Sequence, residues 1–405
     1  DLHKEYRRQR QMCIRDSMHA AVEAKREEIL AFVRELVSIR SVTGQEAPVA
    51  AVVEKKLREL GFDDVQTDRT GNVIGSVGTG ATTILFDGHM DTVDVIDEDR
   101  WTYPPFSGQI ADGNMYGRGT VDMKGALAIS IYAAAIARDL GLLGGRKVYV
   151  AGSVMEEDYD GVAVHNLLRD LSLRPDYVIF GEATGMEICR GHNGRALIEI
   201  TVHGKAAHGS RPELGINPVY RQQAVVARIE ALAAKLSATP GEHGTLSLTN
   251  VNCVTASNNS VPESSSIVLD RRLCITENRQ TIEQEMAFLL DGVDAEWKIC
   301  DIPGVSWTGQ PVLLRSYLPA WEIPEDSRLV QKAKEACRIV FDKPYDAVKL
   351  VYTTDAVATA GELGIPTIVL GPGDSNCHAH GTDEYCPVEE LIRACEVYVQ
   401  LCASL

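Results

Sequence analysis

Short apolar runs of strand character alternate with helical runs over the first 180 residues, and this alternation restricts the fold more than any other feature. Apolar residues recur at helical spacing in residues 20–38 and 48–60. We then expect strands at 72–77, 83–87, 147–153 and 177–180 and helices at 123–140 and 162–170. Such an order predicts an α/β domain around a mostly parallel sheet.

The order of predicted strands and helices changes in the middle of the chain. Residues 196–202, 245–251, 265–273 and 295–300 have strand character, and 217–236 and 281–290 have helical spacing. The order β-α-β-β-α-β is that of a ferredoxin-like α+β unit. After a connection rich in proline and tryptophan, the first rhythm resumes with helices at 327–341 and 356–363, strands at 348–351 and 367–370, and a last helix from Val388.

We therefore predict a small domain inserted into a larger one, as befits a chain of 405 residues. The larger domain would comprise 18–190 and 306–405, and the inserted domain 191–305. Residues 1–17 are basic and polar, lack the apolar core of a secretory signal, and look foreign to the rest. We interpret them as a non-native leader.

The composition argues against several partners. With 40 Lys and Arg against 57 Asp and Glu, the net charge is −17, so we expect no nucleic acid partner. No apolar run approaches the ~18 residues of a membrane span, which predicts a soluble protein with no membrane partner. The ten cysteines include no Cys-x-x-Cys pair, and reduced thiols in the cytoplasm are the simplest interpretation.

Possible metal ligands follow the predicted strands of the larger domain, where an open α/β sheet forms its ligand crevice. His89 and Asp91 follow the second strand, Glu156 and Glu157 the third, and Glu182 the fourth. Taken singly, each has a plainer interpretation as a surface histidine or as the solvated start of a helix.

Two further segments complete the set. Asp122 lies in a glycine-rich turn, G-R-G-T-V-D-M-K-G, and His378 and His380 lie in H-A-H-G-T-D-E. The turn is not a phosphate loop, because it lacks the Gly-Lys-Ser/Thr ending and places an acid where a dinucleotide site has its third glycine. Several carboxylates with two histidines suit a pair of Zn²⁺-like ions.

Six motifs occur in a fixed order along the chain: G-H-M-D-T-V, G-R-G-T-V-D-M-K-G, M-E-E-D, G-E-A-T, H-G-K-A-A-H-G-S and A-H-G-T-D-E-Y. Over nearly all of residues 20–405 the chain resembles the acetylornithine deacetylase / succinyl-diaminopimelate desuccinylase / carboxypeptidase family of di-zinc peptidases. It is most similar to the selenium-metabolism-linked hydrolase branch, through G-S-V-M-E-E-D-Y-D-G, C-R-G-H-N-G-R and S-W-T-G. The resemblance implies a zinc-peptidase-like catalytic domain with an inserted dimerisation domain.

The resemblance also implies roles for single residues. Asp122 would bridge two metal ions. The other ligands would be His89 and Glu182 for the first ion, and Glu157 and His380 for the second. Glu156 would be the general base, and Asp91 would orient His89.

Two histidines need a separate choice. His380 is preferred to His378 because the family places its ligand histidine four residues before a Glu, here Glu384; His378 stays open as the alternative ligand. His208, in the inserted domain, would donate to the tetrahedral oxyanion from the partner subunit of a homodimer. Without the resemblance, His208 is only a polar residue in a Gly/Ser loop.

Further residues would bind the substrate. Arg272, in D-R-R, matches the family's Asp-x-Arg and would bind a substrate carboxylate. An arginine on a strand that pairs only with a surface acid is an equally good interpretation. Asn259 matches the family's binding asparagine. Gly371 and Gly373 would let the backbone approach the substrate closely.

These assignments predict a cytoplasmic enzyme with two Zn²⁺ ions, or Co²⁺ or Mn²⁺, that cleaves an amide or peptide bond beside a free carboxylate in a small molecule or short peptide. The ions would lower the pKa of a water, and Glu156 would take its proton and pass it to the leaving amine. Three alternatives stay open: a carbamoyl- or ureido-amino-acid hydrolase, a non-catalytic dimeric binding relative, and a metal phosphoesterase. The last is disfavoured because only Arg272 and His208 are available for a phosphate.

Overall fold

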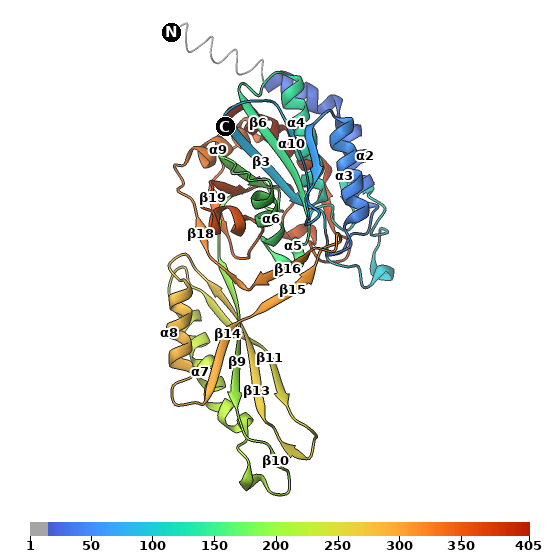
Figure 1. Ribbon diagram of the computed structural model, residues 1–405. Helices are drawn as coiled ribbons and strands as arrows, with labels where there is room; N and C mark the ends of the chain where they lie inside the picture. The colour runs from blue at the N-terminus through green and yellow to red at the C-terminus, as the bar shows by residue number, and fades with distance from the viewer. Residues whose placement is uncertain (1–14) are drawn as a thin grey trace.

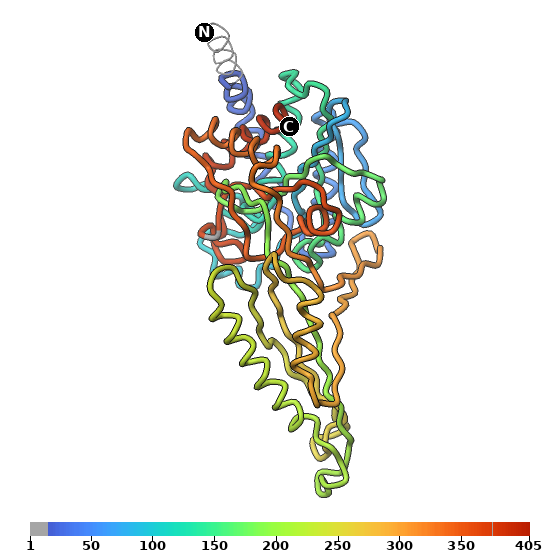
Figure 2. The backbone as a smooth tube through the Cα atoms, turned by 90° about the vertical axis from the view of Figure 1, so that its left-hand side faces the viewer, coloured from blue at the N-terminus to red at the C-terminus, as the bar shows by residue number. Residues whose placement is uncertain are grey.

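The computed structural model describes residues 15–405, which form two bodies of unequal size (Figure 1). The larger body lies at the top of Figure 1, and the smaller one extends away below it. Figure 2, turned by 90°, shows the smaller body tapering to a narrow tip. Of the predicted leader, residues 1–14 lie outside the described residues. Residues 15–24 are helical and precede α2 (Arg26–Val37).

Within the described residues, the larger body is built around a sheet of nine strands. In spatial order they are β1 (Asp63–Thr67), β2 (Val73–Val77), β6 (Arg146–Ser153), β3 (Thr82–His89), β7 (Tyr177–Phe180), β20 (Thr367–Val369), β8 (Ile188–His192) and β18 (Trp321–Glu322), with β19 (Ala347–Leu350) also paired to β8. The four central strands, from β6 to β20, are parallel to one another. The pairs β1–β2, β2–β6, β20–β8 and β8–β18 are antiparallel.

The α/β class is confirmed, but the sheet is mixed and is parallel mainly at its centre. β1 is missing from the strands expected from the sequence, because its residues are exposed or half-buried and show no apolar run. It reaches β2 through a turn at 68–72 that is far too short for the crossover a parallel pair needs, so the two strands are antiparallel.

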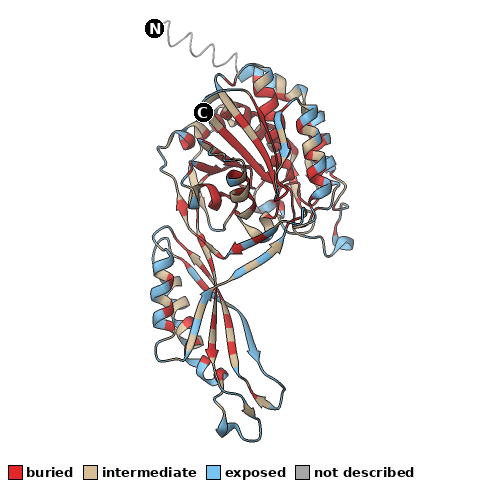
Figure 3. Cartoon of the chain, in the orientation of Figure 1, coloured by how far each residue is buried: buried red, intermediate tan, exposed pale blue. Residues whose placement is uncertain are grey.

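Helices cover both faces of this sheet. Ile84 and Phe86 of β3 join one core, and Leu85 joins the other, as the alternation along a strand requires. The first core lies under α2, α3 (Ala47–Glu59), α4 (Lys124–Asp139), α9 (Arg328–Phe341) and α10 (Val388–Ser404), and the second under α6 (Val162–Asp170) and the π-helix η3 (Val357–Glu362). Figure 3 shows the buried residues concentrated in the larger body.

The alanine-rich helix α4 lies deep in the first core. All its residues except the last two are buried, because small side chains let it approach α2, α10 and the sheet closely. Its Lys124 is buried too, and Nζ donates to the carbonyl oxygens of Leu36 (3.0 Å) and Ile39 (2.7 Å) at the end of α2. Those contacts fix the N-terminus of α4, which begins two residues after Asp122.

The ferredoxin-like unit predicted from the sequence forms the smaller body, so this part of the fold class is confirmed. Its strands are β9 (Gly194–His203), β11 (Thr245–Val254), β13 (Ser264–Leu273) and β14 (Ala295–Ile299), and its helices α7 (Pro218–Ser237) and α8 (Arg279–Leu289). The sheet order is β11-β13-β9-β14, antiparallel throughout. Both helices pack on one face, over Ile198, Ile267 and Leu269. At the tip, β10 (Ala207–His208) pairs with β12 (Ser260–Val261).

The connection rich in proline and tryptophan, residues 307–324, contains strands in the structure. A hairpin of β15 (Asp301–Val305) and β16 (Pro311–Arg315) returns to the larger body, where Nε1 of Trp307 donates to the carbonyl oxygen of Gly71 at 3.2 Å. A Cβ at Gly71 would lie 2.1 Å from that nitrogen, so only glycine fits there. The next strand, β17 (Tyr317–Leu318), pairs with β9 of the smaller body, and β18 then pairs with β8.

The chain therefore passes between the two bodies four times, at residues 192–194, 299–301, 315–317 and 318–321. The predicted domain limit at 190/191 falls within β8. The predicted limit at 305/306 falls inside the β15–β16 hairpin. The exact domain limits stay a prediction.

Three smaller elements flank the larger body. β4 (Gln109–Ala111), β5 (Asn114–Tyr116) and β21 (Tyr385–Pro387) form a separate three-stranded sheet. It ties the segment before Asp122 to the segment after His380, because β5 pairs with both β4 and β21.

Candidate active site

The carboxyl ends of β3, β6 and β7 meet at one edge of the sheet, as neighbouring parallel strands require. They are joined by the turn before α4 and by the loop after β20. Together these segments gather six predicted site residues: His89, Asp122, Glu156, Glu157, Glu182 and His380. Five of them line a cavity of about 510 Å³, and the sixth, His89, is buried behind it.

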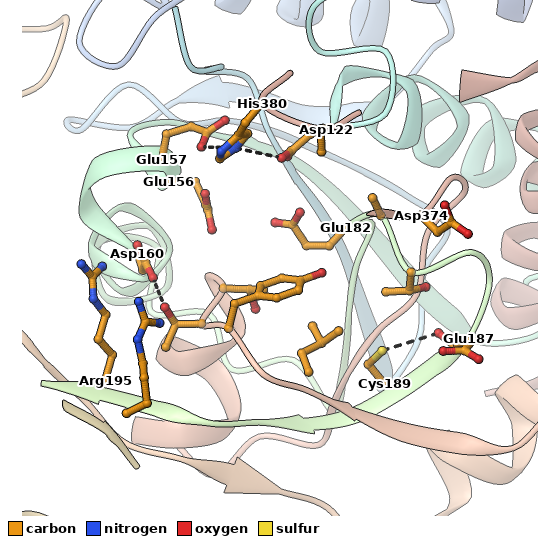
Figure 4. A pocket seen from close by; sticks show the side chains of 18 residues that line it. Asp122, Glu156, Glu157, Asp160, Glu182, Glu187, Cys189, Arg195, Asp374 and His380 are labelled. Atoms are coloured by element: carbon orange, nitrogen blue, oxygen red, sulfur yellow. Dashed lines mark hydrogen bonds and ion pairs between the residues drawn. The ribbon is translucent and has the colours of Figure 1, made fainter. Parts of the chain in front are cut away.

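Asp122 lies between two histidines. Its Oδ1 is 3.0 Å from Nε2 of His89, and its Oδ2 is 3.2 Å from Nε2 of His380. Nε2 of His380 also lies 3.0 Å from Oε2 of Glu157. Figure 4 shows His380 between Glu157 and Asp122. A carboxylate with one oxygen directed to each of two such groups has the arrangement of a bridging metal ligand.

The remaining acids, Glu182 and Glu156, lie near the same ring nitrogen of His89 that faces Asp122. That nitrogen, Nε2, is 3.7 Å from Oε1 of Glu182 and 3.9 Å from Oε2 of Glu156. Two groups of possible ligand atoms therefore share His89, one with Glu156 and Glu182 and one with Asp122 and Glu157. Within each group the atoms lie within 4.8 Å of one another. Imidazole nitrogens and carboxylate oxygens at this spacing suit Zn²⁺ or a similar divalent ion.

The electrostatics of the cluster favour a cation. Burial, reinforced by the charge of Glu182, raises the pKa of Glu156 well above its usual range. Burial also raises the pKa of Glu182, where the charges of Asp122 and Glu157 add to it. Hydrogen bonds to Asp122 and Glu157 raise the pKa of His380 to about 10. The raised pKa values mean that these crowded side chains hold their protons strongly. Divalent ions would stabilise the cluster by displacing those protons.

Asp91 acts on the site differently from the expectation. The Nδ1–H of His89 donates to the main-chain carbonyl oxygen of Asp91 at 2.9 Å, whereas the carboxylate of Asp91 is 3.7 Å away. That carboxylate accepts hydrogen bonds from the backbone N–H groups of Glu156 and Glu157, both at 3.1 Å. Asp91 thus orients His89 through its backbone and holds the start of α5 (Glu156–Tyr159) through its side chain.

Glu384, used in the sequence only as a spacing marker, supports the turn that carries Asp122. It is fully buried, and its Oε1 accepts from the N–H groups of Gly119, Val121 and Asp122 at 2.9–3.2 Å. Its Oε2 accepts from Nη1 of Arg118 at 2.5 Å. Burial raises the pKa of Glu384 to about 7, against the lowering effect of Arg118. Three hydrogen bonds to one oxygen fix the backbone of the turn.

The two neighbouring histidines point to different places. Nδ1–H of His378 donates to the carbonyl oxygen of Thr382 at 3.2 Å, and its ring meets that of Tyr385 edge-on. His380 instead faces Asp122 and Glu157. The geometry therefore supports the preference for His380 over His378.

His208 and Asn259 lie together at the tip of the smaller body, far from this cavity (Figure 1). His208 is exposed on β10, and its Nδ1 accepts from the N–H of Ser210 at 3.1 Å. The N–H of Gly209 donates to the carbonyl oxygen of Asn259 at 2.6 Å, which keeps the two predicted residues adjacent. Neither residue lines the cavity of its own chain.

Arg272 lines the cavity and is also paired with an acid. Its Nε and Nη2 donate to the two carboxylate oxygens of Asp270, at 2.8 and 3.2 Å. The preceding Arg271 points to the other face of the sheet, where it is buried against Glu277 and Glu285. The pairing with Asp270 agrees with the plainer interpretation of Arg272, and its role in binding a substrate carboxylate stays a prediction.

The close backbone approach expected at Gly371 and Gly373 exists, but it is made within the chain. A Cβ at Gly371 would lie 2.1 Å from the carbonyl oxygen of Gly181, and one at Gly373 would lie 2.2 Å from Cγ2 of Val121. Neither glycine lines the cavity. They pack the end of β20 against the segments that carry Glu182 and Asp122, and their contact with substrate stays a prediction.

Several cavity residues were missed in the sequence: Asp160, Glu187, Arg195, Tyr352 and Thr353. Tyr352 and Thr353 follow β19, and the rule that polar residues after a strand line the crevice would have found them. Arg195 and Glu187 carry no such signal, because only the register of the strands brings them to the cavity.

A comparison with protein families shows which family the chain belongs to. The model of peptidase family M20/M25/M40 matches residues 85–404. The chain belongs to this family. This M20 chain is 31% identical over 374 residues to the uncharacterized protein YgeY of Escherichia coli (strain K12), which covers 91% of this chain and 92% of that protein. It is 30% identical to acetylornithine deacetylase of Klebsiella pneumoniae (strain 342), over 83% of this chain and 86% of that one.

A solved structure agrees in fold. YxeP of Bacillus subtilis, described as a dinuclear metal-binding peptidase of the M20 family, superposes with a TM-score of 0.69 at 16% identity, covering 94% of this chain and 98% of that one. The predicted family and the predicted enzyme class are confirmed: the M20 chain is a hydrolase acting on C–N bonds, and it carries groups of metal-binding residues. The selenium-linked branch stays a prediction. Among the described residues, no helix is long and apolar enough to cross a membrane.

Proposed function

We propose that this M20 chain is a di-metal amidohydrolase that cleaves an amide or peptide bond beside a free carboxylate in an N-acyl amino acid or short peptide. The observation that carries the proposal is Asp122, which offers one oxygen toward His89 and the other toward His380. His89 and Glu182 would hold one ion and Glu157 and His380 the other. The donor set of imidazoles and carboxylates fits Zn²⁺, with Co²⁺ and Mn²⁺ as alternatives.

The base in this proposal is Glu156. When bound, two divalent ions polarise the scissile carbonyl and lower the pKa of the attacking water. Glu156 lines the cavity next to the ligand Glu157, and its backbone is fixed by Asp91, so its carboxylate is held beside the reacting groups. It would accept the proton of the water and deliver it to the leaving amine.

The proposal includes a homodimer, because His208 and Asn259 lie at the tip of the smaller body. A partner subunit would bring this tip to the cavity, and His208 would donate to the oxyanion of the tetrahedral intermediate. Nine cysteines of the described residues are free thiols, which supports a reducing, cytoplasmic location.

An activity screen tests the function. The purified protein, loaded in turn with Zn²⁺, Co²⁺ and Mn²⁺, would be assayed on N-acyl amino acids, dipeptides and ureido amino acids. We expect hydrolysis of members of the first two groups. Activity confined to ureido acids would favour the carbamoyl-amino-acid alternative, and failure on all three groups with two metals bound would favour a non-catalytic binding relative.

A His208→Ala enzyme is expected to lose about 10²- to 10³-fold in kcat with little change in KM or metal content. The reason is that His208 would bind the oxyanion, which exists only in the transition state. Steady-state kinetics and metal analysis measure both effects. A comparable rise in KM with kcat retained would place His208 in ground-state binding instead.

Subunit mixing tests whether His208 acts across a dimer. A heterodimer of His208→Ala and Glu156→Ala subunits would have one cavity with Glu156 on its own chain and His208 from the partner. With independent sites, its activity should be about half that of an intact dimer. Confirmed heterodimers that stay inactive would contradict a contribution across subunits.

A further inference from the structure

The β15–β16 hairpin connects the smaller body to the helix that carries the proposed base. It extends from the smaller sheet, because β14 precedes it and β17, which pairs with β9, follows it. At its tip, Trp307 contacts Gly71 of the larger body. Beside it, Oγ1 of Thr308 donates to the carbonyl oxygen of Arg69 at 2.6 Å. The hairpin is therefore held at both ends, and Figure 1 shows it next to α5.

One face of the hairpin packs on the larger body. Val312 and Leu314 of β16 are buried, whereas their neighbours along the strand are exposed. Val312 joins the first core, and Leu314 packs with Val357 of η3 in a small apolar cluster. Ile302 of β15 and Tyr159 of α5 belong to the same cluster. The hairpin and the end of α5 thus share a buried contact.

Tyr159, the last residue of α5, lies across Gly304 of β15. Its hydroxyl donates to the carbonyl oxygen of Pro303 at 3.1 Å. A Cβ at Gly304 would lie 2.4 Å from that hydroxyl oxygen and 2.5 Å from Cζ of the ring, which is too close for any side chain. The backbone of Gly304 does not have a positive φ, so its conformation alone does not require glycine. Glycine is needed here to leave room for the ring of Tyr159.

α5 is too short to hold its own position. It has four residues, and the N–H of Tyr159 closes its single turn by donating to the carbonyl oxygen of Met155 at 2.9 Å. A helix of one turn is not stable without tertiary contacts. Asp91 supplies such contacts at the start of α5, where it accepts from the N–H groups of Glu156 and Glu157. The hairpin supplies them at the other end, through Tyr159.

We propose that the β15–β16 hairpin braces α5 through the contact of Tyr159 with Gly304, and that this contact positions the carboxylates of Glu156 and Glu157. The inference rests on the proposed function and adds Tyr159 and Gly304 as positioning residues. Neither residue lines the cavity, so both act through α5. An extension of the inserted domain thereby takes part in placing the general base of the catalytic domain.

A double-variant cycle tests the brace, with both metal sites filled and the fastest substrate of the activity screen. Gly304→Ala places a methyl group where the ring of Tyr159 lies, so the hairpin or α5 must move. We expect kcat to fall about 10-fold or more with KM largely kept, because a small displacement of a catalytic group lowers the rate steeply. Tyr159→Leu should cause a similar loss. In the Tyr159→Leu background, Gly304→Ala should have little further effect, since the ring is gone.

Two further variants serve as controls. Leu313→Ala is matched in position, because Leu313 is the register partner of Pro303 but is exposed, and it should leave kcat unchanged. Tyr159→Phe keeps the ring and removes only the hydrogen bond to Pro303, so we expect a smaller loss of about 2- to 10-fold. Thermal melting shows whether each variant is folded. If Gly304→Ala or Tyr159→Leu does not fold, Tyr159→Phe decides through the exchange measurement that follows.

Amide hydrogen exchange separates this inference from the proposed function, because it needs no turnover. In the zinc-treated protein, the peptide spanning 154–161 should exchange faster in Gly304→Ala and in both Tyr159 variants than in the wild type, and at the wild-type rate in Leu313→Ala. Faster exchange would support the brace even if the wild type hydrolyses none of the compounds. Wild-type exchange in the folded Tyr159 variants, or an effect of Gly304→Ala on kcat that is the same with and without the ring, would overturn it.

Discussion

An Asp122→Ala protein is expected to lose its metal and its activity together. Within residues 15–405, Asp122 is the one carboxylate with an oxygen 3.0 Å from Nε2 of His89 and another 3.2 Å from Nε2 of His380, so its removal takes a ligand from both proposed ions at once. Loss of a bridging carboxylate would also remove negative charge from between the two proposed ions, so their mutual repulsion would increase. We expect fewer than one metal equivalent per subunit by mass spectrometry and no measurable hydrolysis.

Glu187→Ala provides the matched control for metal content. Glu187 lines the same cavity and is exposed, but it belongs to none of the groups of possible ligand atoms in the described residues. This variant should therefore keep two metal equivalents. An Asp122→Ala enzyme that keeps two metals and hydrolyses substrate would exclude the bridging role.

A Glu156→Gln enzyme is expected to keep both metals while kcat falls at least ~10²-fold, because the amide cannot accept the proton of the attacking water. The structure makes this a sharp test. Oε2 of Glu156 is only 3.9 Å from Nε2 of His89, and with Glu182 these atoms form a possible ligand group. Geometry alone thus allows Glu156 to be either a base or a ligand.

Metal analysis decides between these roles. Two equivalents with a low kcat would support the base, and one equivalent would make Glu156 a ligand. Glutamine is close to glutamate in shape and leaves the backbone hydrogen bond from Glu156 to Asp91 in place. The effect can then be assigned to the lost carboxylate, and a kcat near that of the wild type would contradict both roles.

The sequence was sufficient to predict those parts of the candidate site that depend on where a residue lies along a strand. His89, Glu157 and Glu182 were found because polar residues after central parallel strands must meet at one edge. The ferredoxin-like order was found because its strands and helices have clear and different periodicities. These features depend on local pattern and on connection rules that allow few alternatives.

Features that depend on strand register, or on contacts between segments far apart in the sequence, were not predictable from the sequence. The opposition of Arg195 and Arg272 depends on the exact pairing of β9 with β13, which no local pattern specifies. The use of the Asp91 backbone instead of its carboxylate depends on where α5 begins. The antiparallel β1 was missed because a half-exposed edge strand has no apolar run.

The position of β20 has a consequence for how the chain is made. β20 lies between β7 and β8, which are neighbours in sequence, yet it is formed by Thr367–Val369, close to the end of the chain. At ribosomal rates of about 5–20 residues per second, the edge of β7 waits on the order of 10–40 s for its partner. During that time the ferredoxin-like unit can fold, since its four main strands are complete by Ile299. The nascent chain would therefore carry a finished inner domain beside an unpaired edge of β7, and such an edge can pair wrongly with other chains until Thr367–Val369 are made.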